Sequence, residues 1–261
     1  MLFYNDIPAA NGSSETLVIL HGLFGTGDNW ITLARHWSQH YRVILPDARN
    51  HGHSFQSDIF DYPAMALDLK ELVDHLGLTK FHLMGHSMGA KTSMYYALQH
   101  GNSLQSLSLI DMSIFRNQLD HQKVYLRAMA DLDLEQMNSR TEVDQALSTS
   151  IPDFGIRQFL LKSLTRNEHK QFAWRLNLPV FLTTVDAIGE GIPTEGRFEG
   201  PTLFLRGGKS DYVKDSDWPL ILERFPNAEL QTIPQAGHWV HADSPQEFSS
   251  IFLPFIQKHS L

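Results

Sequence analysis

The first 112 residues alternate between short apolar runs and stretches in which apolar residues recur at helical spacing. Apolar runs of strand length lie at 16–20, 42–45, 80–84 and 104–110. Helical spacing is found in the stretches between them, at 30–37, 63–76 and 90–98. Buried strands that alternate with helices are typical of a parallel sheet covered by helices on both faces. We therefore predict an α/β protein with a mostly parallel central sheet.

This pattern stops after Asp111 and returns near residue 200. Between 113 and 196 we find no strand-length apolar run bounded by turn signals, and helices are expected at 122–132, 144–148, 156–164 and 172–176. Strand-like runs return at 202–205 and 230–233, before a last helix at 245–256. We predict an α/β core made of 1–112 and 197–261, with an inserted helical cap at 113–196.

One serine has a glycine two residues away on each side, in Gly85-His86-Ser87-Met88-Gly89. An apolar run precedes this motif and a helical stretch follows it, so Ser87 is expected on a sharp strand-to-helix turn. In that context G-x-S-x-G marks a strained turn that lifts the serine oxygen above the sheet. Ser87 is therefore the candidate nucleophile.

A serine hydroxyl needs a neighbouring base, and the base needs an orienting acid. His238 follows the last predicted strand, so it should lie at the same carboxyl edge of the sheet as Ser87. Asp111 ends the strand after the nucleophile helix, and Asp211 follows the next core strand. Either loop can reach His238, so spacing alone leaves both acids open. The order serine, acid, histidine is that of the α/β-hydrolases.

Backbone N–H groups near the serine could stabilise the oxyanion that forms during acyl transfer. One donor is expected to be the N–H of Met88, which directly follows the nucleophile. The other is expected in "HGLFG", residues 21–25, at Leu23 or alternatively at Phe24. Because both positions supply main-chain groups, their side chains are free to be apolar and to shape a pocket.

The other histidines near these motifs are interpreted as structural. His86, beside the nucleophile, is expected to pack within the turn, and His241 is expected to begin the last helix. His51 and His53 alternate on a loop without carboxylates at ligand spacing. We therefore predict no metal and no cofactor.

Composition narrows the class of protein further. The net charge is −8 and no Lys/Arg cluster stands out, which argues against a nucleic-acid partner. The chain has no cysteine, which excludes disulfides and thiol nucleophiles. Its first residues do not resemble a signal peptide, and no apolar run approaches the ~20 residues needed to span a bilayer. We expect a cytoplasmic protein without a membrane span, either a monomer or a homodimer.

Six motifs together resemble those of the YbfF-type bacterial esterases: "LHGLFG", "DARNHGHS", "MGHSMGAK", "LIDMS", "LFLRGGKSDYV" and "AGHWVHADSP". The resemblance covers nearly the whole chain and is weakest in the predicted insertion. It implies an α/β-hydrolase with a helical cap. It also implies hydrolysis of simple esters and acyl-CoA thioesters.

The resemblance also carries site residues. The triad that it implies is Ser87, Asp111 and His238, which favours Asp111 as the acid. Ser210 matches a serine expected near the histidine as a fourth member. Tyr212 matches a tyrosine that faces the substrate crevice.

The chain departs from the family pattern at two places. Asp211 stands where relatives have no acid, so it could capture the histidine or stay exposed. The basic residues that bind substrate after the triad acid do not align cleanly. Arg116, Lys123 and Arg127 are the candidates here for contacting a phosphate or carboxylate.

The predicted reaction is hydrolysis of a small-molecule ester or acyl thioester through an acyl-enzyme on Ser87. Substrate contacts are expected from Phe24 and from apolar residues of the insertion, namely Phe154, Phe159, Leu160, Phe172, Trp174 and Phe181. Three alternatives remain: carbon–carbon bond hydrolysis, a perhydrolase activity, and a non-catalytic small-molecule receptor. Dehalogenase and epoxide hydrolase chemistry is disfavoured because it needs an aspartate at position 87.

Overall fold

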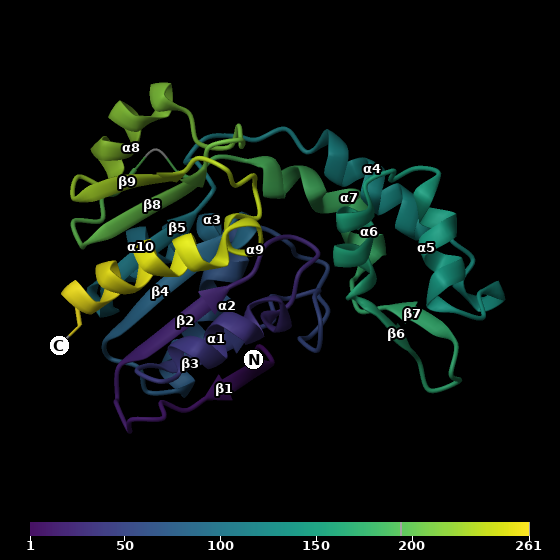
Figure 1. Ribbon diagram of the computed structural model, residues 1–261, viewed down its shortest axis with the longest axis horizontal. Helices are drawn as coiled ribbons and strands as arrows, with labels where there is room; N and C mark the ends of the chain where they lie inside the picture. Colours follow the sequence, from purple (N-terminus) through teal and green to yellow (C-terminus); the bar gives the residue numbers. More distant parts are fainter. Residues whose placement is uncertain (194, 261) are drawn as a thin grey trace.

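The computed structural model describes residues 1–193 and 195–260. Its core is a seven-stranded sheet in the order β1-β3-β2-β4-β5-β8-β9 (Figure 1). The strands are β1 Tyr4–Ile7, β2 Thr16–Leu20, β3 Arg42–Pro46, β4 Phe81–His86, β5 Leu104–Ile110, β8 Thr202–Gly207 and β9 Ala228–Ile233. Only the edge strand β1 pairs antiparallel; the other pairings in this sheet are parallel.

Helices cover both faces of this sheet. One apolar cluster joins the sheet to α2 (Tyr62–His75), α3 (Met88–His100) and α8 (Trp218–Arg224). A second cluster, on the other face, joins it to α1 (Ile31–Trp37) and α10 (Pro245–Lys258). The central strands β2, β4 and β5 are buried along their whole length. Burial on both faces explains why these strands are continuous apolar runs, and the predicted fold class is confirmed.

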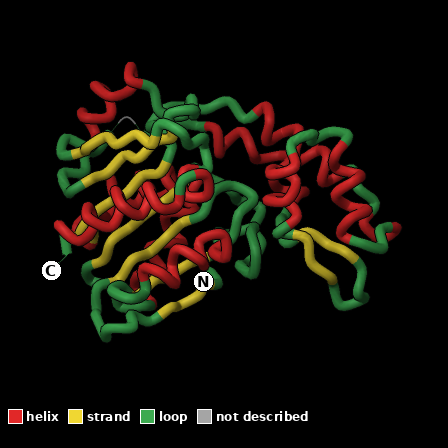
Figure 2. The backbone as a smooth tube through the Cα atoms, viewed as in Figure 1, coloured by secondary structure: helices red, strands yellow, loops and turns green. Residues whose placement is uncertain are grey.

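The chain between β5 and β8 lies to one side of the sheet (right in Figures 1 and 2). It contains α4 Asp120–Ala130, α5 Arg140–Ser148, α6 Phe154–Leu161 and α7 Leu178–Gly189. A third apolar cluster packs these helices together and onto Phe24, Tyr62 and Met88 of the core. The range predicted for the insertion, 113–196, includes Thr194, which lies outside the described residues.

Two expectations for this segment and the N-terminus were wrong or incomplete. Residues 172–176 do not form a helix: β7 (Phe172–Trp174) pairs antiparallel with β6 (Leu164–Arg166) in a small hairpin. Strands of three residues are too short to show a period of two in the sequence. Strand β1 was not predicted because it is a short, half-exposed edge strand with only one aliphatic residue.

Candidate active site

Ser87 lies on the turn between β4 and α3 with φ +55° and ψ −117°. A positive φ at a residue with a side chain is strained and is concentrated at functional sites. Each flanking glycine is required by close packing around this turn. A Cβ on Gly85 would lie 2.2 Å from the carbonyl oxygen of Gly89, and a Cβ on Gly89 would lie 2.4 Å from that of Leu20. The glycines therefore let α3 approach the turn and strand β2 closely.

The structure brings Ser87, His238 and Asp111 into one hydrogen-bonded chain. His238 Nε2 lies 3.0 Å from Ser87 Oγ, and His238 Nδ1 lies 2.7 Å from Asp111 Oδ2. The Asp111 side chain is fully buried. It accepts further hydrogen bonds from the backbone N–H of Gly207, at 3.1 Å, and from the hydroxyl of Ser210. These contacts fix the carboxylate beneath the imidazole.

Asp211, the alternative acid, is exposed, and the hydrogen bond of His238 Nδ1 goes to Asp111 instead. The two aspartates follow neighbouring parallel strands, β5 and β8, so both lie at the same edge of the sheet. Asp111 turns inward in a left-handed backbone conformation, with φ +48°. Ser210, one residue before Asp211, is the residue of that loop that reaches the buried carboxylate.

Two aromatic rings hold the His238 loop in place. Tyr212 stacks on the His238 imidazole with ring centroids 4.1 Å apart, and its hydroxyl accepts a hydrogen bond from Gln122 of α4 at 3.1 Å. His86 Nε2–H donates to the carbonyl oxygen of His238 at 2.9 Å. Burial, followed by the neighbouring charge on His238, holds the pKa of His86 well below its usual range. His86 is therefore a neutral donor to the loop, as its structural interpretation expected.

The loop of residues 21–25 packs directly on the serine turn. A Cβ on Gly22 would lie 3.2 Å from the Cβ of Ser87. The N–H of Phe24 donates to His51 Nε2 at 3.2 Å, so it is not free to bind an oxyanion. This removes Phe24 as the alternative donor. In the described part of the chain the N–H of Leu23 has no hydrogen-bond partner. The N–H of Met88 belongs to the first residue of helix α3.

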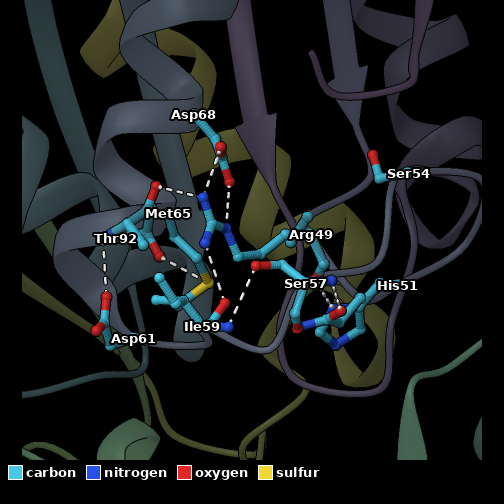
Figure 3. Close-up of polar contacts among 12 residues, drawn as sticks. Arg49, His51, Ser54, Ser57, Ile59, Asp61, Met65, Asp68 and Thr92 are labelled. Atoms are coloured by element: carbon cyan, nitrogen blue, oxygen red, sulfur yellow. Dashed lines mark hydrogen bonds and ion pairs between the residues drawn. The ribbon is translucent and has the colours of Figure 1, made fainter. Parts of the chain in front are cut away.

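The histidine-rich loop 47–54 contacts residues 21–25 through His51, and Figure 3 shows how Arg49 of this loop is held. Arg49 forms a buried two-point ion pair with Asp68 of α2, at 2.6 and 2.8 Å. The carbonyl oxygen of Arg49 accepts the Nδ1–H of His51 at 2.9 Å, which leaves Nε2 to accept from Phe24. Burial keeps the pKa of His51 well below its usual range, so this acceptor stays unprotonated.

A cavity of about 540 Å³ opens beside Ser87 and His238. Its walls come from loop 21–25, from α1 and the turn before it, from the His238 loop, and from α4 and α6. Most of the larger side chains in these walls are apolar: Leu23, Phe24, Trp30, Leu33, Tyr125, Ile156, Phe159, Leu160 and Trp239. Polar side chains, several of them histidines, also line it, and a largely apolar cavity with polar groups among its walls is typical of a small-molecule site.

The predicted anion-binding residues lie outside this cavity. Arg116 is exposed and pairs with Glu190 at 3.5 Å. Lys123 pairs with Asp186 of α7 at 2.6 Å. Arg127, on the same helix as Lys123, is exposed and is not among the residues that line the cavity. Their roles as substrate contacts stay predictions; in this structure the first two pair with acidic residues of the same segment and none of the three lines the cavity.

The predicted aromatic contacts divide into two groups. Phe24, Phe159 and Leu160 line the cavity. Trp174 does not: its Nε1–H donates to the carbonyl oxygen of Met129 at 3.1 Å, so it fastens the hairpin to α4. The remaining expected residues, Phe154, Phe172 and Phe181, also lie outside the lining. Phe154 is exposed, Phe172 packs on Arg166, and Phe181 packs on Phe60.

Several lining residues were missed by the sequence analysis. Trp239 directly follows His238, so its position beside a candidate base was a usable signal. Trp30 and Leu33 belong to the helix after loop 21–25, where nothing in the sequence separates a cavity wall from a core contact. Lys162 follows α6 and lines the cavity opposite the core. The described residues contain no group of three or more potential metal ligands, and none of their helices is long and apolar enough to cross a membrane.

Comparison with known proteins identifies the family of this chain. A family model described as alpha/beta hydrolase fold matches residues 15–121. The sn-1-specific diacylglycerol lipase ABHD11 of Mus musculus is 40% identical over 247 residues, which are 92% of this chain and 80% of that protein. Esterase YbfF of Escherichia coli (strain K12) is 33% identical over 238 residues, or 89% of each chain.

A solved structure of a marine microorganism esterase has a TM-score of 0.93 and is 36% identical, covering 97% of this chain and 98% of that one. The family resemblance predicted from the motifs is thus confirmed. The chain therefore belongs to the alpha/beta hydrolase family and is a hydrolase of the esterase and lipase group.

Proposed function

We propose that this protein is a serine carboxylesterase that works through an acyl-enzyme on Ser87. The observation that carries the proposal is the continuous chain from Asp111 through His238 to Ser87, with contacts of 2.7 and 3.0 Å. A buried acid, a histidine and a strained serine in this order are the parts that activate a hydroxyl as a nucleophile.

In the first half of the reaction, Ser87 Oγ attacks the ester carbonyl while His238 Nε2 takes the hydroxyl proton. Asp111 accepts the Nδ1–H of His238, which fixes the tautomer and stabilises the imidazolium. His238 then gives its proton to the oxygen of the leaving alcohol. In the second half, a water molecule attacks the acyl-enzyme while His238 takes its proton, and His238 returns that proton to Ser87 Oγ as the acid leaves.

The N–H groups of Leu23 and Met88 are proposed to bind the oxyanion. Their support is local: the loop of Leu23 packs against Ser87, and the neighbouring N–H of Phe24 is already bonded to His51. Donors that are fixed before the reaction stabilise the developing charge without reorganisation. In comparable sites one such donor lowers the activation barrier by roughly 3–4 kcal/mol.

We further propose that residues 113–196 form a cap that supplies the acyl pocket. The contribution of α4 and α6 to the cavity walls supports this role. The substrates would be small carboxylic esters and, through attack on the same carbonyl carbon, acyl thioesters such as acyl-CoA. The names of the relatives, esterase and diacylglycerol lipase, favour esters with apolar acyl groups.

Hydrolysis of p-nitrophenyl esters from acetate to palmitate tests the proposal, with Ser87→Ala and His238→Gln beside the wild type. We expect each variant to lose about 10³-fold or more in kcat/KM on every ester that the wild type cleaves. Ser250→Ala, at an exposed position on α10, is the matched control and should keep wild-type turnover. Undiminished turnover by Ser87→Ala would contradict the proposed nucleophile.

A further inference from the structure

The cavity beside Ser87 has a lysine on its wall whose charge has no partner. Lys162 caps the C-terminal end of α6, directly after Phe159 and Leu160, which also line the cavity. Its ammonium group makes no hydrogen bond or ion pair with any residue of 1–193 or 195–260. Burial, then the charge on His238 and lastly that on Lys162 lower the pKa of His241, another residue of the cavity wall, to about 3.

No carboxylate faces this lysine across the cavity. The described lining residues include no Asp or Glu, and their titratable members besides Lys162 are a tyrosine and histidines. Burial lowers the pKa of His21, His86 and His241, which keeps these imidazoles neutral. Lys162 is thus the one lysine or arginine among the lining residues that the structure describes.

Two cations on the neighbouring helices α4 and α6 differ from Lys162. Lys123 pairs with Asp186 at 2.6 Å, and Arg157 pairs with Asp144 at 2.8 Å. Both charges are neutralised within the protein, whereas that of Lys162 is available at the cavity. Lys162 is an exposed residue, so water screens its charge and an anion bound there gains only a modest free energy.

We propose that the site takes esters that also carry an anionic group, a carboxylate or a phosphate, and that Lys162 binds this group. The inference rests on the proposed function of Ser87 and adds the substrate class. Phe159 and Trp239, whose ring centroids are 5.4 Å apart, lie on the same walls as Lys162. The expected substrate therefore has its ester carbonyl at Ser87, an apolar middle part, and its charge at the end of α6.

Matched pairs of esters, one anionic and one neutral, test this proposal. The quantity compared is the kcat/KM of the anionic ester divided by that of the neutral ester. Mono-p-nitrophenyl glutarate against p-nitrophenyl pentanoate places the charge on the acyl side. On the alcohol side, 4-acetoxybutanoate and 2-acetoxyethyl phosphate are compared with butyl acetate in a pH-stat. We expect Lys162→Met to lower the ratio about three- to tenfold for at least one pair, mainly through KM, and to leave the neutral esters unchanged.

Added salt and a second lysine provide the controls. Raising the ionic strength to about 0.5 M should shrink the wild-type ratio, because the interaction is between charges. Lys258→Met, exposed on α10 and outside the cavity, should not alter it. If the wild type is active but its anionic-to-neutral ratio of kcat/KM equals that of Lys162→Met for every pair, this inference is overturned. The proposed esterase function is then unaffected. A wild type that cleaves none of the esters overturns both.

Discussion

Replacing Lys91 by methionine should remove a pH dependence of stability. Lys91 lies one helical turn beyond Ser87 and is fully buried. Its ammonium group donates to the carbonyl oxygens of Gly189 and Glu190, at 3.3 and 2.5 Å, where α7 ends. Tyr62 donates to the carbonyl oxygen just before them, so two core side chains hold the end of this helix.

The magnitude follows from the shifted pKa of this lysine. Burial lowers the pKa of Lys91 from 10.5 to about 7, and the charge of Glu190 offsets part of the burial effect. Between these two pH values the unfolded chain binds more protons than the folded protein, so the free energy of unfolding rises with pH. The rise amounts to about 2 kcal/mol between pH 7 and 9. Below pH 7 both states are protonated and the slope from this group disappears.

Urea unfolding at constant ionic strength, from pH 6 to 9.5, measures the effect. Other titrating groups are common to both proteins, so the difference between wild type and Lys91→Met isolates this lysine. The exposed Lys258→Met serves as the control and should follow the wild type. Parallel stability curves for wild type and Lys91→Met between pH 7 and 9 would refute the reasoning.

Three further predictions concern the site itself. Asp111→Asn should lower kcat on p-nitrophenyl acetate by about 10³–10⁴-fold. Asp211→Asn should stay within about twofold of wild type, because the hydrogen bond of His238 goes to Asp111. The reverse ranking would place the acid in the later loop. His86→Phe should lower kcat about tenfold with little change in KM, because only the positioning of the His238 loop is lost; a change confined to KM would contradict that role. Gly89→Ala should lower the melting temperature by about 5 °C or more, since its Cβ would clash with backbone, and an unchanged value in calorimetry would contradict the packing argument.

The strands of the core were predictable because burial on both faces makes them continuous apolar runs. The same reasoning failed for the hairpin of β6 and β7, whose strands are three residues long and half-buried. It also failed for β1, which pairs with the sheet through backbone groups that any residue supplies. Length and burial thus decided which strands the sequence could reveal.

For the site, the motif around Ser87 and the position of His238 were readable because their local backbone requirements leave marks, namely glycines and strand ends. The choice between Asp111 and Asp211 was not readable from spacing. Both follow parallel strands, and only the inward turn of the earlier loop separates them. Their roles in catalysis stay predictions for the assays above.

Charged substrate contacts were the least predictable part. Arg116 and Lys123 were chosen for their charge, but Glu190 and Asp186, more than 60 positions further along the chain, neutralise them. Lys162 was overlooked because nothing local marks a lysine without a partner. Pairing of charges across long sequence separations is set by the fold, so it has no signature in the sequence.

The most direct test of the central claim is covalent labelling with a fluorophosphonate, followed by intact-mass and peptide mass spectrometry. The account predicts one adduct per chain, located on Ser87, with loss of ester hydrolysis in proportion to labelling. Ser87→Ala should remain unlabelled, and Ser250→Ala should label like the wild type. An adduct on another residue, or none in a protein that still hydrolyses esters, would contradict the claim that Ser87 is the nucleophile.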